Sequence, residues 1–218
     1  MRRLKTLGAA ALVVILLGVA QLVLPGIAAH RLRDRLSRSG RVLEVQVHAF
    51  PAIELLWHHA DSVLVRMASY RATPSSLPST LAQAGDVGTL QASAQLFQDG
   101  LLTLHNASLS KHDNGLTGAA TVTQSDLRTA LPILTSVTPV ASGDGRLVLR
   151  GTATLFGLSA TVDATVSAQN GKLVVTPDIP LGGLATVTVF SDSRIRVTGV
   201  SATAVPGGFT VRGTAVLR

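Results

Sequence analysis

Apolar and polar residues alternate strictly over eleven positions in the second half of the chain, from Leu158 to Ala168. The even positions carry Leu, Ala or Val, and the odd positions between them carry Ser, Thr or Asp. A period of two sends the two sets to opposite faces of an extended strand. Such a strand fits an antiparallel sheet that packs one face on a core and exposes the other to water. Three other segments repeat the alternation: Leu43–Val47, Val63–Met67 and Phe209–Leu217.

Similar turn sequences recur along the chain and divide it into hairpin units. Each unit begins with an acidic turn, continues with a strand pattern, and returns through a second strand that starts at a glycine. The opening turns are Asp99-Gly100, Asp144-Gly145 and Asp192-Ser193, and the returning strands start at Gly115, Gly157 and Gly208. The units begin 45 and 48 residues apart, a spacing too variable for a solenoid. We therefore predict a meander of long hairpins in one sheet.

Helical signals are short and few. Residues 50–57 place Pro51 in a first helical turn, with Ile53, Leu56 and Trp57 on one face. A second short helix is predicted from Ser76 to Leu81, and a third from Asp126 to Leu131, where Pro132 ends it. We therefore predict an α+β protein that is mostly β.

The positive charge of the chain is concentrated at its N-terminus. Residues 1–41 hold eight Lys or Arg and one acid, whereas residues 42–218 hold eleven of each sign. The net charge of +7 therefore describes the N-terminal segment, and the remaining 177 residues, enough for one domain, are neutral.

An uncharged run, strongly apolar from Leu7 to Leu24, lies inside this basic segment. As a helix its eighteen residues would span about 27 Å, close to the hydrocarbon thickness of a bilayer. A basic start, an apolar run and small residues near its end also describe a signal peptide, with cleavage after Ala20 or near Ala29. Both readings stay open at this point. We divide the chain into a signal peptide or anchor (1–29), a basic juxtamembrane segment (30–41) and a β-rich domain (42–218).

The charges around the apolar run point to two different orientations. Three Lys or Arg precede the run and five follow it, which by the positive-inside rule favours a cytoplasmic C-terminus. The signal-like layout favours export, and we expect export. The arginines that follow the run either lie against anionic headgroups or belong to a solvated linker helix. These membrane-surface candidates are Arg31, Arg33, Arg35, Arg38 and Arg41.

Composition argues against several function classes. The chain has no Cys, which excludes disulfides, thiolate metal sites and a Cys nucleophile. A neutral body with seven aromatic residues in the whole chain is not typical of a nucleic-acid binder. His58 and His59 are adjacent and point in different directions, so we expect no metal site there. No catalytic or phosphate-binding motif occurs, and we predict a non-enzyme without a cofactor.

Several segments together resemble a known family. The resemblance covers about residues 30–218, and its most specific marker is Phe50-Pro51. The matching segments are 45–56, 61–65, 122–127 with 130–132, 195–200 and 208–213. They are similar to the LmeA-like phospholipid-binding family of actinobacterial cell-envelope proteins. One departure is Trp57-His58-His59, where the family often has a glycine.

The resemblance implies a long, curved antiparallel sheet of hairpins wrapped around a few short helices, as in tubular lipid-binding domains. It also implies phospholipid and the membrane as partners, a place on the extracytoplasmic side of the plasma membrane, and no catalytic residues. Small inward side chains on the 158–168 strand leave room for an apolar ligand or for a tightly packed element. The lipid-facing set that we predict is Phe50, Pro51, Ile53, Leu56, Trp57, Ala160, Val162 and Ala164.

Two other functions are compatible with the sequence. A neutral β-rich domain without a catalytic motif also suits a scaffold that binds other envelope proteins. An envelope enzyme whose catalytic residues converge from distant segments is the third reading. A packed interior and a retained protein partner would indicate the scaffold, whereas bound phospholipid would indicate the lipid-binding protein.

Overall fold

The computed structural model describes residues 21, 23–52, 55, 59–72, 87–130, 134–155, 158–179 and 186–218. Most of them form strands, and the predicted class, α+β but mostly β with long antiparallel hairpins, is confirmed. Both sheets are open. The helix predicted over residues 76–81 lies outside the described residues.

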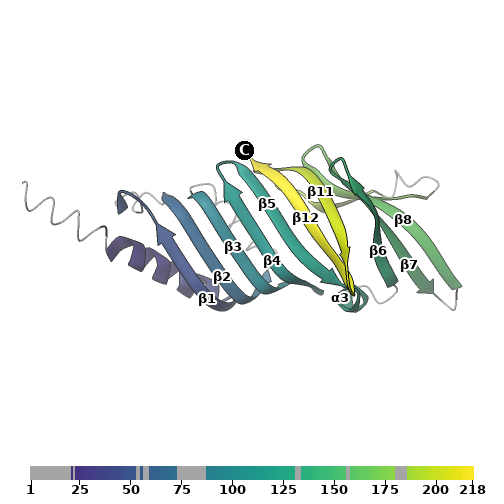
Figure 1. The fold of residues 1–218 in the computed structure, drawn as a ribbon, viewed down its shortest axis with the longest axis horizontal. Coiled ribbons are helices and arrows are strands. Elements are labelled where there is room, and N and C mark those ends of the chain that lie inside the picture. The colour runs from purple at the N-terminus through teal and green to yellow at the C-terminus, as the bar shows by residue number, and fades with distance from the viewer. Residues whose placement is uncertain are drawn as a thin grey trace, which may run out of the picture.

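The strands form two sheets, where we predicted one (Figure 1). Sheet A has seven strands in the order β1-β2-β3-β4-β5-β12-β11, and sheet B has five in the order β10-β9-β8-β7-β6. The strands of sheet A are β1 (Gly40–His48), β2 (Ala60–Ala72), β3 (Val87–Asp99), β4 (Leu102–His112), β5 (Gly115–Thr123), β12 (Gly208–Leu217) and β11 (Ile195–Val205). Those of sheet B are β6 (Leu134–Gly143), β7 (Arg146–Leu155), β8 (Leu158–Gln169), β9 (Lys172–Pro177) and β10 (Val187–Phe190).

The predicted turns at Asp99-Gly100 and Asp144-Gly145 join paired strands, β3 to β4 and β6 to β7, whereas Asp192-Ser193 leads from sheet B to sheet A. Asp144 and Gly145 have φ angles of 51° and 71°. Asn170 and Gly171, a turn that we did not predict, join β8 to β9 with φ angles of 53° and 79°. Two successive positive φ angles define the type I′ turn, which matches the twist of a hairpin and favours Asp-Gly and Asn-Gly. These sequences therefore fix the register of sheet B at one end.

One strand pair departs from the antiparallel pattern. β2 and β3 are parallel, with Val63 beside Leu90 and Val65 beside Ala92. Parallel neighbours need a connection of about a dozen residues or more to bring the chain back. The fourteen residues between Ala72 and Val87 provide that length.

Sheet B ends against the edge of β11 instead of continuing sheet A. The backbone N–H groups of Val197 and Val200 donate to the carbonyl oxygens of Gly171 and Gly145, at 2.9 and 3.1 Å. The N–H of Ala202 donates to the Ser142 hydroxyl at 3.0 Å. Turns of sheet B thus satisfy donors that an edge strand would otherwise leave free. Sheet B therefore covers part of the free edge of sheet A.

Helix α3 (Gln124–Ala130) connects the sheets and begins two residues before the helix that we predicted over residues 126–131. The Gln124 side chain donates to the Val137 carbonyl oxygen and accepts from the Val137 N–H at 3.0 Å, which ties α3 to β6. At the other side of the helix, His105 Nε2 on β4 lies 2.9 Å from Asp126 Oδ2. α3 is therefore fixed to both sheets.

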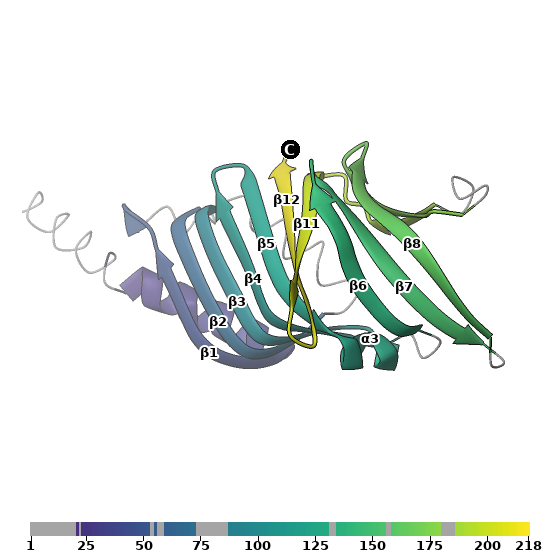
Figure 2. The same cartoon turned by 45° about the vertical axis from the view of Figure 1, so that its right-hand side comes forward.

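A helix over residues 23–37, here called the N-terminal helix, lies against sheet A at the end remote from sheet B (Figures 1 and 2). Its Ala28, Ala29, Leu32 and Leu36 pack on a cluster that includes Val47, Val63 and Val65. Within the described residues, no helix has the length and apolar character needed to cross a membrane. Most of the apolar run at 7–24 lies outside them.

A second core forms where the two sheets meet. Leu147 and Val166 of sheet B contact Val200 and Phe209 of sheet A, and Leu127 of α3 packs at its margin. Leu147 is 1% exposed. The molecule is thus held together by one core under the N-terminal helix and another at the sheet junction.

Candidate functional site

Each sheet has one largely apolar face, and we call this face the inner face. In sheet B it is the face of Leu147 and Val166, which are direct partners in the β7–β8 ladder. The same register places Leu149 beside Ala164, Gly151 beside Val162 and Ala153 beside Ala160. The inner face of sheet B is therefore built from aliphatic side chains and glycine along the whole length of β7 and β8.

Only part of this inner face is covered. Along β8 the exposed fraction rises from 7% at Val166 to 37% at Val162 and 78% at Leu158. Across the sheet it rises from 7% at Val166 to 61% at Val187, the residue that pairs with Val175 on β9. The sheet junction buries one half of the face and leaves an open aliphatic surface on the other.

The sheet-facing members of the predicted lipid set lie on this surface. Ala160 and Val162 are exposed and Ala164 is half-buried, and all three share the inner face. The prediction that alternation would bury them was wrong for the first half of β8, because no described element packs on that half. Their role in lipid binding stays a prediction.

Two other members of the set, Phe50 and Pro51, lie at the opposite end of the molecule. Phe50 is 80% exposed, Pro51 follows it through a cis peptide bond, and the Phe50 N–H donates to Asp61 Oδ2 at 2.6 Å. They follow β1, which is six strands away from β11 in sheet A, or roughly 29 Å of sheet. Ile53, Leu56 and Trp57 lie outside the described residues. The structure therefore does not bring Phe50 and Pro51 near Ala160, Val162 and Ala164.

The basic residues lie on the outside of the N-terminal helix and of β1. Arg31, Arg33, Arg35, Arg38 and Arg41 are all exposed, whereas Leu32 and Leu36 face the sheet. Arg33 Nη2 donates to the Leu43 carbonyl oxygen at 3.3 Å. The helix is amphipathic and its arginines are exposed, and their contact with a membrane surface stays a prediction.

Between the two cores, small residues form the inner face of sheet A. One ladder row runs from Val65 through Ala92 and Leu109 to Gly118 and Gly213. The next inner row pairs Ala120 with Val211. From Ala92 onward these residues are only partly buried. They extend the apolar face toward the sheet junction.

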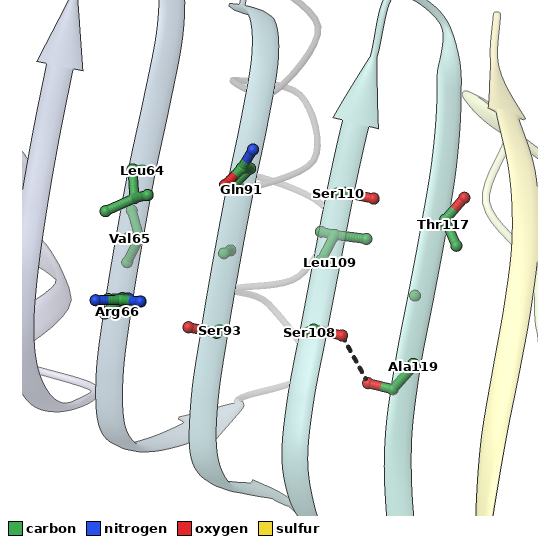
Figure 3. Close-up of a pocket in the computed structure, with 12 residues that line it drawn as sticks. Leu64, Val65, Arg66, Gln91, Ser93, Ser108, Leu109, Ser110, Thr117 and Ala119 are labelled. Atoms are coloured by element: carbon green, nitrogen blue, oxygen red, sulfur yellow. Dashed lines mark hydrogen bonds between the residues drawn. The ribbon is translucent and has the colours of Figure 1, made fainter.

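A hollow of about 300 Å³ lies across strands β2 to β5 (Figure 3). Most of its lining belongs to two ladder rows of the other face of sheet A, which are Leu64-Gln91-Ser110-Thr117 and Arg66-Ser93-Ser108-Ala119. An Arg66–Glu44 pair at 3.3 Å borders it. Hydroxyl, amide and guanidinium groups line this hollow together with aliphatic side chains. It opens on the other face of the sheet from the apolar inner face.

A protein-family model described as LmeA-like phospholipid-binding matches residues 17–216, nearly the whole chain. The chain belongs to this family. No curated protein and no solved structure matches it significantly. The family that the Phe50-Pro51 segment and the closing strands resemble is thus confirmed, and it is a lipid-binding family.

The LmeA-like chain presents apolar residues that sequence reasoning did not assign to a site. Leu158 was treated only as part of the strand pattern, and Leu149 and Val187 were not considered for lipid contact. The alternation of β7 residues, visible from Leu147 to Leu155, would have identified Leu149. Val187 had no such signal, because β10 has only four residues.

The charged groups near the open surface are on its other side. Arg150 donates two hydrogen bonds to Asp163, at 2.7 and 2.8 Å, and these bonds lower the pKa of the Asp163 carboxyl. The pair lies on the outer face of sheet B, as the alternation predicts for Asp163. Among the described residues no three His, Asp or Glu side chains gather as a metal site would require.

Proposed function

We propose that this protein binds phospholipid, with the acyl chains on the open half of the inner face of sheet B. The observation that carries the proposal is the set of exposed aliphatic residues on that face, of which Leu158 and Val187 are the most exposed. The chain that carries this surface belongs to a phospholipid-binding family. Exposed apolar surface of this extent marks a site that another apolar group covers.

An acyl chain suits this surface for physical reasons. Side chains such as Ala160, Val162 and Ala164 are short, so a long flexible chain approaches the sheet closely along its whole length. Each methylene group taken out of water contributes about 0.8 kcal/mol. Among the described residues the face offers no charged group to a ligand, since Arg150 and Asp163 point to the other side. Hydrocarbon rather than a polar metabolite therefore fits it best.

We further propose that the protein is held on the extracytoplasmic side of the plasma membrane and serves in lipid maintenance or transfer without catalysis. The apolar run at 7–24 and the exposed arginines of the N-terminal helix support membrane attachment. The family resemblance to envelope proteins supports the location.

Uptake of lipid by delipidated protein tests the binding proposal. We expect saturable uptake of a phosphatidylglycerol that carries a fluorescent acyl chain, at a fixed ratio of lipid to protein. Competition by unlabelled phospholipid should reverse the signal. Delipidated, folded protein that takes up no lipid would remove the basis of the proposal.

A cysteine-reactive probe tests the location, because the natural chain has no Cys. We introduce Asp113→Cys at the turn between β4 and β5, where the side chain is 86% exposed. A maleimide that cannot cross the plasma membrane should label this variant in cells with an intact cytoplasmic membrane. Labelling only after lysis would place the domain in the cytoplasm.

A further inference from the structure

Three exposed aliphatic residues gather at the end of sheet B that points away from β11. We call them the distal rim. They are 37 to 78% exposed, and no described segment covers them. The distal rim consists of Leu158, Val162 and Ile179. A cluster of this kind is unusual on a surface that faces only water.

The ladder pattern explains why these residues meet. β7 ends and β8 begins at this end of the sheet, and β9 leaves β8 there, with Pro177 beside Ala164. The connection from β9 to β10 starts at the same end. In Figures 1 and 2 the rim end of sheet B and the N-terminal helix lie at opposite ends of the long axis.

The described rim segments contain no charged residue. Residues 151–155, 158–162 and 179 include no Asp, Glu, Lys, Arg or His. The charged residues that border them are Arg150, Asp163 and Asp178, and the first two pair with each other. The rim end of the molecule is thus neutral, although the whole chain has a net charge of +7.

Polar side chains of the rim segments pair with one another on the outer face. The hydroxyls of Thr154 and Ser159 lie 3.0 Å apart, and those of Thr152 and Thr161 lie 3.1 Å apart. Removing this end from bulk water therefore leaves these side-chain hydroxyls with a hydrogen-bond partner, which lowers the cost of desolvation.

We propose that the distal rim docks on a phospholipid bilayer and passes acyl chains between that bilayer and the inner face. The proposal rests on the proposed lipid binding. Leu158 and Val162 belong both to the rim and to the inner face, so a chain that leaves the bilayer at the rim stays on aliphatic surface. The described rim lacks the aromatic and Arg side chains that dominate the binding energy of protein interfaces. Contact with bilayer hydrocarbon requires only apolar surface, which the rim provides.

A spin label at the rim tests the docking in the full chain. We compare Leu158→Cys with Ser159→Cys, which is exposed at the same end but on the outer face. Both variants are labelled with a nitroxide and reconstituted into vesicles of phosphatidylcholine and phosphatidylglycerol. Collision rates with oxygen and with a water-soluble nickel complex are then measured. Oxygen concentrates in bilayer hydrocarbon, whereas the charged complex is excluded from it.

We expect the label at position 158 to meet the nickel complex at least about threefold less often than the label at 159, while oxygen collisions rise. Frequent nickel collisions at both positions would overturn the docking. Few collisions with both reagents at 158 would also overturn the docking. A label that is covered by a bound lipid or by a second protein copy is shielded from oxygen as well as from the nickel complex. Phospholipid is also extracted from the same purified variants, to distinguish failure of the docking from failure of lipid binding. If lipid is present but position 158 does not enter the bilayer, only the docking proposal is contradicted.

Discussion

Val162 and Thr161 are neighbours on β8 whose side chains face opposite sides of sheet B. Val162 lies beside Gly151 on the inner face, and the Thr161 hydroxyl lies 3.1 Å from that of Thr152 on the outer face. Both positions are exposed, so a carboxylate at either one has access to water while the site is empty. The two positions therefore form a matched pair for testing which face meets the lipid.

We expect Val162→Asp to reduce lipid loading at least about tenfold and Thr161→Asp to leave it nearly unchanged. An acyl chain placed on the inner face would desolvate the new carboxylate at 162, at a cost above about 1.4 kcal/mol, which is a factor of ten. Bound phospholipid is quantified after extraction from each purified variant. Equal losses in the two variants would show that the inner face is not the lipid side.

Two glycines at the sheet junction combine a left-handed backbone with close packing. A Cβ at Gly145 would lie 3.4 Å from the Gly199 Cα, and one at Gly171 would lie 3.2 Å from the Arg196 Cγ. Gly100 has a similar φ angle of 59° but no atom within 4 Å of such a Cβ. It therefore carries the backbone cost of a substitution without the packing cost.

Gly145→Ala and Gly171→Ala should each lower the free energy of unfolding by about 1–3 kcal/mol, and more than Gly100→Ala does. The additional loss measures the contact between the sheet B turns and β11. Urea denaturation of the three variants gives the comparison. If Gly100→Ala is as costly as the other two, the junction contributes little to stability.

At the scale of elements, helix α3 is fixed by a carboxylate whose protonation can be followed. Burial raises the pKa of Asp126, but hydrogen bonds from Thr123 and His105 outweigh it and lower the pKa from its ordinary value of 3.8. A depressed pKa in the folded state means that this stabilisation is complete above the unfolded value and is lost as the pH falls below it.

Asp126→Asn should therefore destabilise the protein by about 1 kcal/mol at pH 7. The difference from wild type should shrink as the pH falls below about 4, where wild-type Asp126 also takes up a proton. Thermal unfolding between pH 3 and pH 7 measures it. Asp113→Asn is the control, because that side chain is 86% exposed. A difference that stays constant across this range would show that Asp126 acts through packing alone.

Elements were predictable from sequence to the extent that local chemistry determines them. Asp144-Gly145 specified its turn through two positive φ angles, and Pro132 limited α3. The parallel β2–β3 pair and the division into two sheets were not predictable. They depend on a long connection and on hydrogen bonds such as Val200 to Gly145, between residues 55 positions apart. Period-two alternation assigned Val162 to the correct face, but burial depends on what packs there.

At the scale of the whole molecule, the N-terminal helix joins the basic segment to the β-rich body. Sequence reasoning placed a domain boundary at residue 42, yet Leu32 and Leu36 pack on the core of sheet A. Their burial is partial, so each Leu→Ala substitution should cost about 1 kcal/mol.

The double variant Leu32→Ala/Leu36→Ala should thus lower the unfolding free energy by about 2 kcal/mol and speed amide hydrogen exchange in β1 and β2. Arg31→Ala, on the exposed side of the helix, should change neither. Exchange measured by mass spectrometry resolves the strands. Unchanged protection of β1 in the double variant would mean that the helix does not support the sheet.

The same packing determines which chain should be used to test lipid binding. Protein that begins at residue 42 lacks the helix contacts of sheet A, so the full chain is the appropriate sample. Native mass spectrometry of the full chain released from detergent, followed by lipid extraction, measures the central claim most directly. The account predicts a stoichiometric phospholipid adduct in the wild type that is much reduced in Val162→Asp. A clean protein mass, unchanged after incubation with phospholipid vesicles, would contradict it.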